Sequence, residues 1–251
     1  DVAVADLTLA SDDVMYILSN LFVRRLSKTG DTWPPPEPRV RTLLDSGHTI
    51  ATPLQNPELE DWVIVGDAGQ GKVAYADFSQ VPVKFEPAPE DRIGVPVLGN
   101  VHVIFDDGFE YNKTIYAASH NIGRTSGKIY RWVIDKSTSW DELEPPNSAF
   151  YGLAQQNDVL YGAWRAAILA NIPPGVGVDR SLFPRATVPP TANLEWDDLT
   201  EGLITGVVFT REPSSLKTSS NDDVNLWAID NRNYNWASNN GTGCLWAYTD
   251  T

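Results

Sequence analysis

The sequence predicts an all-β fold, a β-propeller of about five four-stranded blades, from three observations. Strand-type segments that contain an aromatic residue recur along the 251 residues at similar spacing. A second strand-type segment precedes each of them, and a third follows most of them. Gly, Asn, Asp and Pro separate these segments, and no long stretch has the period of an amphipathic helix. Short strands rich in branched and aromatic residues, separated by turn formers, are typical of an all-β chain.

The aromatic segments define the repeat. They are Val14–Leu18, Trp62–Gly66, Thr114–Ala118, Val159–Ala163 and Asn225–Ile229. Their first residues lie 48, 52, 45 and 66 positions apart, and propeller blades of this type repeat at about 40 to 50 residues. The last interval must therefore contain an insertion. A β-sandwich is the alternative, but a sandwich does not require similar segments at similar spacing.

The flanking strands complete each repeat. The segments expected before the aromatic ones are Ala5–Leu9, His48–Ala51, Val101–Phe105, Phe150–Ala154 and Ile204–Phe209. Those expected after them are Leu21–Arg25, Lys72–Ala76, Lys128–Trp132 and Cys244–Tyr248. One short helix is expected, within Gly162–Leu169. Small residues follow the aromatic ones, at Ala117–Ala118, Gly162–Ala163 and Ala228, where converging blades must approach closely.

We expect one domain over residues 1–251, with blades at about 1–43, 44–95, 96–146, 147–201 and 202–251. The fifth repeat has no fourth strand of its own. Either the N-terminal segment Asp1–Val4 fills that gap and closes the ring, or the chain is part of a larger propeller. Five blades can close a ring, so both interpretations stay open.

Composition excludes several classes of function. The formal net charge is −14, so the surface repels nucleic acids and anionic membranes. No continuous apolar stretch is long enough to span a bilayer. The single cysteine, Cys244, rules out an intrachain disulfide framework and cysteine-based metal clusters. The histidines His48, His102 and His120 are far apart, and none has a neighbour at the spacing of a metal ligand.

The third repeat contains the most specific motif. Gly127–Trp132 is followed by Asp135-Lys136-Ser137-Thr138-Ser139-Trp140, which resembles the Ser-x-Asp-x-Gly-x-Thr-Trp hairpin of the bacterial neuraminidase repeat (Asp-box) family of propellers. Asp135 stands at the aspartate position, Ser139 at the threonine and Trp140 at the tryptophan. Ser137 replaces the glycine and Val133 the serine, so the copy is degenerate.

Two further segments carry parts of the motif. Leu26–Trp33 keeps Gly30, Thr32 and Trp33 but has Lys28 at the aspartate position. Trp196-Asp197-Asp198-Leu199 repeats the sequence type Trp140-Asp141-Glu142-Leu143 after 56 residues. The resemblance implies that the aspartate hydrogen-bonds to amides of the hairpin and that the tryptophan packs between sheets. These are structural roles, so the resemblance indicates the fold rather than a reaction.

The resemblance also suggests a sialidase or another glycosidase, but the residues for that chemistry are not evident. Such enzymes use paired carboxylates, or a tyrosine with a carboxylate, and sialidases add an arginine cluster. The family's Arg-Ile-Pro signature has only a loose echo in Arg92–Pro96. Acidic pairs are frequent, but adjacent residues on a strand point to opposite faces and do not form a dyad. No catalytic residue is therefore assigned.

Clustered hard oxygens in loops suggest candidate calcium ligands. The candidates are Asp106, Asp107, Asp222 and Asp223. Neither cluster matches the EF-hand loop, and Asp is also common in ordinary turns. We expect no other cofactor.

The resulting hypothesis is a non-catalytic scaffold that is extracellular or at the cell surface and binds proteins or copies of itself. Nine tryptophans and nine tyrosines supply contact residues if some are exposed. A glycan-binding module, in which exposed aromatic rings stack on sugars, and an Asp-box glycosidase are the alternatives. An assay with fluorogenic glycosides separates the glycosidase from the other two.

Overall fold

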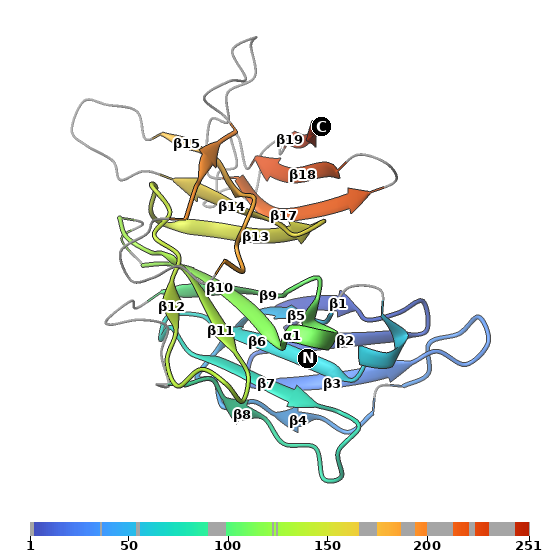
Figure 1. Cartoon of the computed structure of the whole chain (residues 1–251). Helices are drawn as coiled ribbons and strands as arrows, with labels where there is room; N and C mark the ends of the chain where they lie inside the picture. Colours follow the sequence, from blue (N-terminus) through green and yellow to red (C-terminus); the bar gives the residue numbers. More distant parts are fainter. Residues whose placement is uncertain are drawn as a thin grey trace.

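The computed structural model confirms the β-propeller (Figure 1). It describes residues 3–35, 37–53, 56–89, 99–121, 123, 125–165, 175–186, 194–199, 213–220, 224–230 and 244–250. Five antiparallel sheets, here called blades 1 to 5 in chain order, contain all the described strands. Within each blade the strands follow one another in sequence order, from the axis outwards.

The strand bounds are as follows. Blade 1 contains β1 (Asp6–Leu9), β2 (Val14–Ser19), β3 (Phe22–Ser27) and β4 (Val40–Arg41), and blade 2 contains β5 (Gly47–Ala51), β6 (Trp62–Asp67), β7 (Val73–Asp77) and β8 (Glu86–Pro87). Blade 3 contains β9 (Asn100–Phe105), β10 (Thr114–His120), β11 (Ile129–Val133) and β12 (Asp141–Glu142). Blade 4 contains β13 (Phe150–Gln156), β14 (Val159–Arg165), β15 (Val176–Ser181) and β16 (Asp197–Asp198), and blade 5 contains β17 (Pro213–Ser220), β18 (Val224–Asp230) and β19 (Cys244–Asp250).

Four apolar clusters hold the blades together, one at each junction between consecutive blades. They join blade 1 to blade 2, blade 2 to blade 3, blade 3 to blade 4, and blade 4 to blade 5. The aromatic residues of the repeat lie in them: Tyr16, Tyr116 and Tyr161 have no exposed surface. Within the described ranges, no such cluster joins blade 5 back to blade 1. The ring of described blades is therefore open.

The strands match the predicted segments closely, with two differences. Ile204–Phe209 lies outside the described residues, and the strand that pairs with β18 is instead β17, Pro213–Ser220. The helix expected within Gly162–Leu169 is wrong over its described part, because Gly162–Arg165 belongs to β14. The described helices are α1 (Phe109–Asn112) and the 3-10 turn η1 (Pro57–Leu59), and neither could cross a bilayer.

Small residues do lie where blades approach closely. A Cβ atom at Gly66 of blade 2 would lie 2.4 Å from the backbone oxygen of Val101 in blade 3. A Cβ at Gly162 of blade 4 would lie 2.7 Å from the Ile129 side chain of blade 3. Gly66 therefore requires glycine unless the backbone shifts, whereas a Cβ at Gly162 would require the Ile129 side chain to move.

Residues 3 and 4, the described part of the N-terminal segment Asp1–Val4, belong to no strand of blade 5. The amide of Ala5 donates a hydrogen bond to the oxygen of Leu18 at 2.8 Å, which continues the pairing of β1 with β2 in blade 1. Blade 5 has three strands among the described residues, with β19 at its outer edge. The described part of residues 1–4 therefore leads into blade 1.

Candidate functional site

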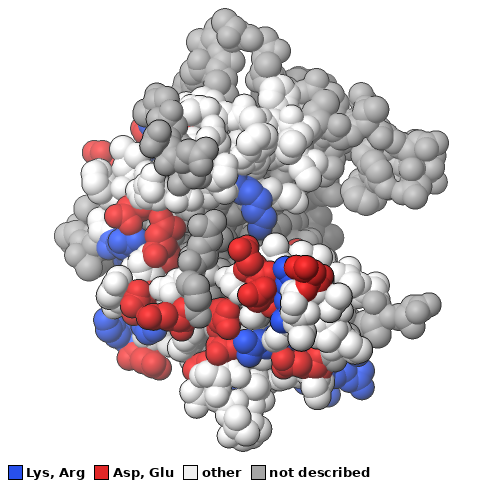
Figure 2. All heavy atoms as spheres, turned by 90° about the vertical axis from the view of Figure 1, so that its right-hand side faces the viewer, with Lys and Arg blue, Asp and Glu red and all other residues white. Residues whose placement is uncertain are grey.

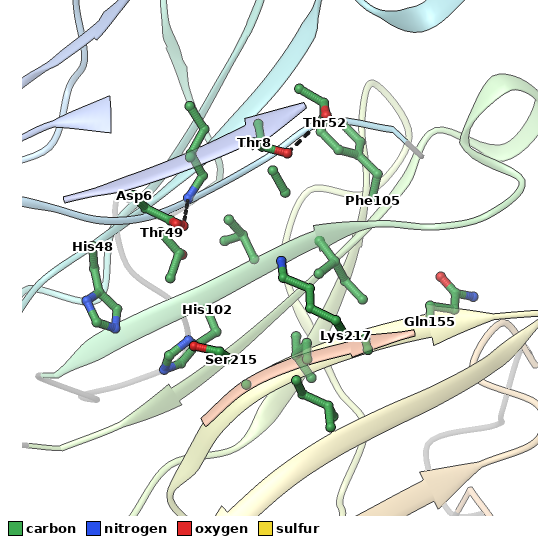
Figure 3. Close-up of a pocket in the computed structure, with 18 of the residues that line it drawn as sticks. Asp6, Thr8, His48, Thr49, Thr52, His102, Phe105, Gln155, Ser215 and Lys217 are labelled. Carbon is green, nitrogen blue, oxygen red and sulfur yellow. Dashed lines mark hydrogen bonds between the residues drawn. The ribbon is translucent and has the colours of Figure 1, made fainter. Parts of the chain in front are cut away.

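The innermost strands of the five blades surround a cavity of about 350 Å³ on the propeller axis (Figure 3). Strands β1, β5, β9, β13 and β17 all contribute lining residues, because each begins its blade at the axis. The lining is mixed: Ile50, Val103 and Phe105 are apolar, whereas hydroxyl, amide, imidazole and charged groups stand between them. The cavity is therefore the concave site where several blades present side chains to one ligand-sized space.

One carboxyl group and one ammonium group carry the charge of the described cavity lining. The Asp6 carboxylate accepts hydrogen bonds from the amides of Leu7 and Ile50, each at 2.9 Å. Burial raises the pKa of Asp6, while the two amide bonds and the positive charge of Lys217 act against that rise. Lys217 extends from β17 into the cavity (Figure 3). Asp6 thus links blade 1 to blade 2, and its oxygens already have backbone partners.

All three histidines of the chain meet at this axis. His48 comes from β5, His102 from β9 and His120 from the end of β10. The ring centre of His102 lies 4.8 Å from that of His48 and 5.6 Å from that of His120. The ring of Tyr151 in β13 stacks on His120 at 4.1 Å. The cluster therefore spans blades 2, 3 and 4.

Burial lowers the pKa of two of these histidines, His48 and His102. Burial lowers the pKa of His48, and the nearby Asp67 carboxylate only partly opposes this. Burial lowers the pKa of His102 well below its ordinary value, and repulsion from His48, His120 and Lys217 lowers it further. His120 Nδ1 lies 3.0 Å from the Phe150 oxygen. Among the described residues, no group of three or more His, Cys, Asp or Glu side chains has an arrangement that could hold a metal ion.

Asp106, one of the calcium candidates, is the centre of a buried hydrogen-bond network. Its side chain has no exposed surface and accepts hydrogen bonds from five groups. The donors are the Gly108 amide, the Asn112 amide group, the Tyr116 hydroxyl, the Gln155 amide group and the Arg185 guanidinium. Burial alone would raise the pKa of Asp106, but these hydrogen bonds, with Arg185 first, lower it overall. Asp106 therefore joins blades 3 and 4.

The other calcium candidates are placed differently. Asp107 lies beside this network, and its carboxylate accepts a hydrogen bond from the Asp158 amide at 3.0 Å. Asp222 and Asp223 lie outside the described residues. Calcium binding stays a prediction, and the five donors around Asp106 already occupy its oxygens.

The residues of the Asp-box-like segments lie at hairpins on the outer side of the blades. Asp135 occupies the turn between β11 and β12 with a left-handed φ of 62°, and Ser139 follows it on the surface. Trp140 packs against the cluster between blades 2 and 3. Trp196 packs against the next cluster and donates a hydrogen bond to the Leu143 oxygen at 2.9 Å.

The remnant in blade 1 is less buried. Gly30 lies in the turn between Thr29 and Thr32 with a φ of 59°, and Trp33 is 40% exposed. None of the Asp-box-like residues lies among those that line the axial cavity. These segments therefore shape the blades and leave the cavity to other residues.

Sequence reasoning missed the histidine cluster and the cavity lining. A usable signal was present, because His48 and His102 lie in the first strands of consecutive repeats. First strands of neighbouring blades lie side by side at the axis, so an alignment of the repeats would have brought these two together. His120 gave no such signal, because it ends a second strand.

Comparison with known proteins supports the fold. No protein-family model and no curated protein matches the sequence. A chain of a nidogen/laminin complex aligns over 98% of this chain and 80% of its own, with a TM-score of 0.58 and 14% identity. Kuenenia stuttgartiensis hydrazine synthase aligns over 93% of this chain at a TM-score of 0.56 and 11% identity. The extracellular domains of Drosophila semaphorin 1b align over 99% at 0.53 and 11%.

These likenesses are distant in sequence and do not extend over the whole of every relative. This chain spans 58% of the hydrazine synthase chain and 54% of the semaphorin chain. At 11–14% identity, the comparisons establish the propeller fold alone. Function must therefore be argued from the residues of this chain.

Proposed function

We propose that this chain is a non-catalytic, extracellular or cell-surface β-propeller that binds a protein partner. The observation that carries the proposal is the chemistry of the axial cavity. Asp6 is the one described lining residue with a carboxyl group, and two backbone amides bind its oxygens. Glycoside hydrolysis by paired carboxylates requires a second group at about 5 to 10 Å. The described lining does not provide that pair.

The fold is consistent with an interaction role. Propellers present broad faces and rims, and one of the structural neighbours was solved within a nidogen/laminin complex. The net charge of −14 favours a partner surface with basic groups. Asp and Glu side chains spread over the lower half of the face in Figure 2. Protein binding is therefore the proposal that agrees with both the cavity and the surface.

The test combines an activity assay with a binding assay. The full chain is incubated with fluorogenic sialosides, arabinofuranosides and xylosides, with Asp6→Asn as the matched variant. We expect no release of fluorophore above the buffer rate from either protein. Turnover by the parent chain that Asp6→Asn abolishes would contradict the proposal.

The binding arm separates proteins from glycans. The full chain is applied to a glycan array, and in parallel to a biosensor surface over which purified extracellular proteins are passed. Saturable binding to one purified protein, with no glycan signal, is the expected result. Glycan binding that is lost in Lys217→Ala would instead support the glycan-binding alternative, because Lys217 extends into the cavity.

A further inference from the structure

The central strands of the blades differ in how much of them is buried. In blade 3, every residue of β10 is buried. In blade 2, all of β6 is buried except its first residue, and in blade 4 all of β14 is buried except its first and last residues. In β2 of blade 1, the first four residues alternate between buried and partly buried. In β18 of blade 5, Leu226 and Ala228 are buried while Trp227 between them is 37% exposed. Among the described residues, blades 2, 3 and 4 thus pack on both faces, and blades 1 and 5 on one.

The face of blade 1 that points away from blade 2 is apolar. Leu7 and Leu9 of β1 are 52% and 58% exposed, and they pair across the sheet with Ile17 and Met15 of β2. The intervening residue Tyr16 points the other way, into the cluster with blade 2. We call Leu7, Leu9, Met15 and Ile17 the blade 1 end face. Its composition is that of an interior face, although it is not covered by another described blade.

The face of blade 5 that points away from blade 4 is apolar as well. Trp227 of β18 pairs with Ala247 of β19, and Leu245 beside it is 67% exposed. Leu226 of the opposite face packs against blade 4. We call Trp227, Leu245 and Ala247 the blade 5 end face. The molecule contains four junctions between consecutive blades, and each junction has two apolar faces. The blade 1 end face and the blade 5 end face correspond to the two sides of such a junction.

Blades 1 and 5 are the two ends of the series of described blades, and no apolar cluster of described residues joins them. In Figure 1, β17, β18 and β19 of blade 5 lie above β1 and β2 of blade 1, and we call the region between the two end faces the opening. An occupant of this opening could contact both end faces at once.

We propose that the opening between blades 1 and 5 binds an antiparallel β-sheet of a partner protein, which packs as a further blade with one apolar face on each end face. The proposal deepens the proposed function, on which it rests, by naming the class of partner. In each of the four junctions, one sheet packs face to face on the next sheet. A sheet bound in the opening would pack on blades 1 and 5 in the same way. Apolar faces buried in this way release water from both surfaces.

The size of the faces argues for an occupant that touches both. The three strands of blade 5, with eight, seven and seven residues, cover roughly 300 Å² on one side, from the rise per residue and the strand spacing, and the shorter strands of blade 1 cover less. A stable interface buries about 800 Å² per partner, so one end face alone is too small and an occupant must touch both to approach that area. A second copy of this chain could offer only its own end blades, each already covered on one side. A sheet with two apolar faces is the occupant that matches both surfaces.

The test uses the chain's own blade 3 as the probe, since it packs on both faces in the structure. A copy of residues 99–146 is fused after Thr251 through a flexible linker that contains a protease site. The unfused full chain is the reference. We expect the fusion to raise Tm by at least about 5 °C, since burial of both end faces stabilises the folded state. We also expect the added sheet to co-elute with the chain in size exclusion after the linker is cut.

Two variants of the fusion provide the controls, and circular dichroism checks that each is folded. Leu245→Asp places a charge on the blade 5 end face and should remove both the gain in Tm and the co-elution. Tyr111→Asp changes a residue on α1 that is 82% exposed and lies outside both end faces, and it should leave them unchanged.

Three results would overturn the proposal. An unchanged Tm of the fusion would show that the opening does not accept a sheet. Separation of the added sheet after cleavage would show that a sheet from another polypeptide is not held. A concentration-dependent dimer of the unfused chain that Leu245→Asp abolishes, seen by analytical ultracentrifugation, would show that a second copy covers the end faces. Each of these outcomes is independent of the glycoside assay.

Discussion

The histidine cluster predicts a loss of stability at mildly acidic pH. His48 and His102 are neutral in the folded protein because burial lowers their pKa below 6.5, and repulsion between the rings adds to this for His102. In the unfolded chain both imidazoles have ordinary pKa values. As the pH falls below 6.5, the unfolded chain takes up protons that the folded protein does not, so the free energy of unfolding decreases.

The size of the effect follows from this linkage. A histidine that stays neutral in the folded state costs about 2 kcal/mol of stability at pH 5 relative to pH 7. Asp179 acts in the opposite direction, because burial raises its pKa to about 7. The folded protein therefore binds a proton at Asp179 between pH 7 and pH 4 that the unfolded chain does not, which stabilises the fold as the pH falls. A variant is needed to separate the two contributions.

The assay is urea denaturation at pH 7, 6 and 5, followed by the fluorescence of the nine tryptophans. His102→Gln removes one titrating group from the cluster and keeps a polar side chain. We expect this variant to lose about 2 kcal/mol less stability than the parent between pH 7 and pH 5. Asp179→Asn is the control of opposite sign: it should lose more stability than the parent over the same range. Parallel curves for His102→Gln and the parent would refute the neutral, buried cluster.

Three further predictions about the packing are tested by urea denaturation. Asp106→Asn removes the buried carboxylate that accepts hydrogen bonds from five groups, among them the partly exposed Arg185 guanidinium, and should cost about 1.5 to 3 kcal/mol; a cost below about 1 kcal/mol would contradict the network. Gly66→Ala should cost about 1 to 3 kcal/mol of unfolding free energy, because its Cβ would meet the backbone of the next blade. Gly123→Ala is the control and should cost less, because its Cβ would have no neighbour within 3.4 Å. Equal costs for the two variants would contradict the close approach of blades 2 and 3. Leu245→Ser on the blade 5 end face should change stability by less than about 0.5 kcal/mol, while Leu226→Ala on the covered face should cost about 2 to 5 kcal/mol. A large loss in Leu245→Ser would show that this end face is covered.

The repeat could be predicted because every copy has the same packing requirement. The second strand of each blade packs at least one face on a neighbouring blade and therefore needs apolar residues. All five aromatic segments are predominantly apolar, and they correspond to β2, β6, β10, β14 and β18. The first strand of blade 5 could not be found this way. Pro213–Ser220 has one buried apolar side chain, Leu216, among serines, threonine and lysine, so the more apolar Ile204–Phe209 was the better candidate by sequence.

The open ring and the cavity could not be predicted from the sequence. Leu7 and Ile17 of the blade 1 end face are as apolar as the buried Leu18, so composition does not distinguish an exposed face from a covered one. The histidines meet because three blades converge on one axis, which no local pattern encodes. Asp106 looked like a turn aspartate or a calcium ligand, and its five donors come from residues up to 79 positions away.

Hydroxyl-radical footprinting of the full chain tests the central claim, an open five-blade propeller, most directly. The only methionine, Met15, lies on the blade 1 end face, and Trp227 lies on the blade 5 end face. Tyr116 lies in the covered junction between blades 3 and 4, and Tyr161 in the one between blades 4 and 5. We predict oxidation of Met15 and Trp227 with protection of the two tyrosines. Protection of Met15 and Trp227 in the isolated chain, or rapid oxidation of the tyrosines, would contradict this architecture.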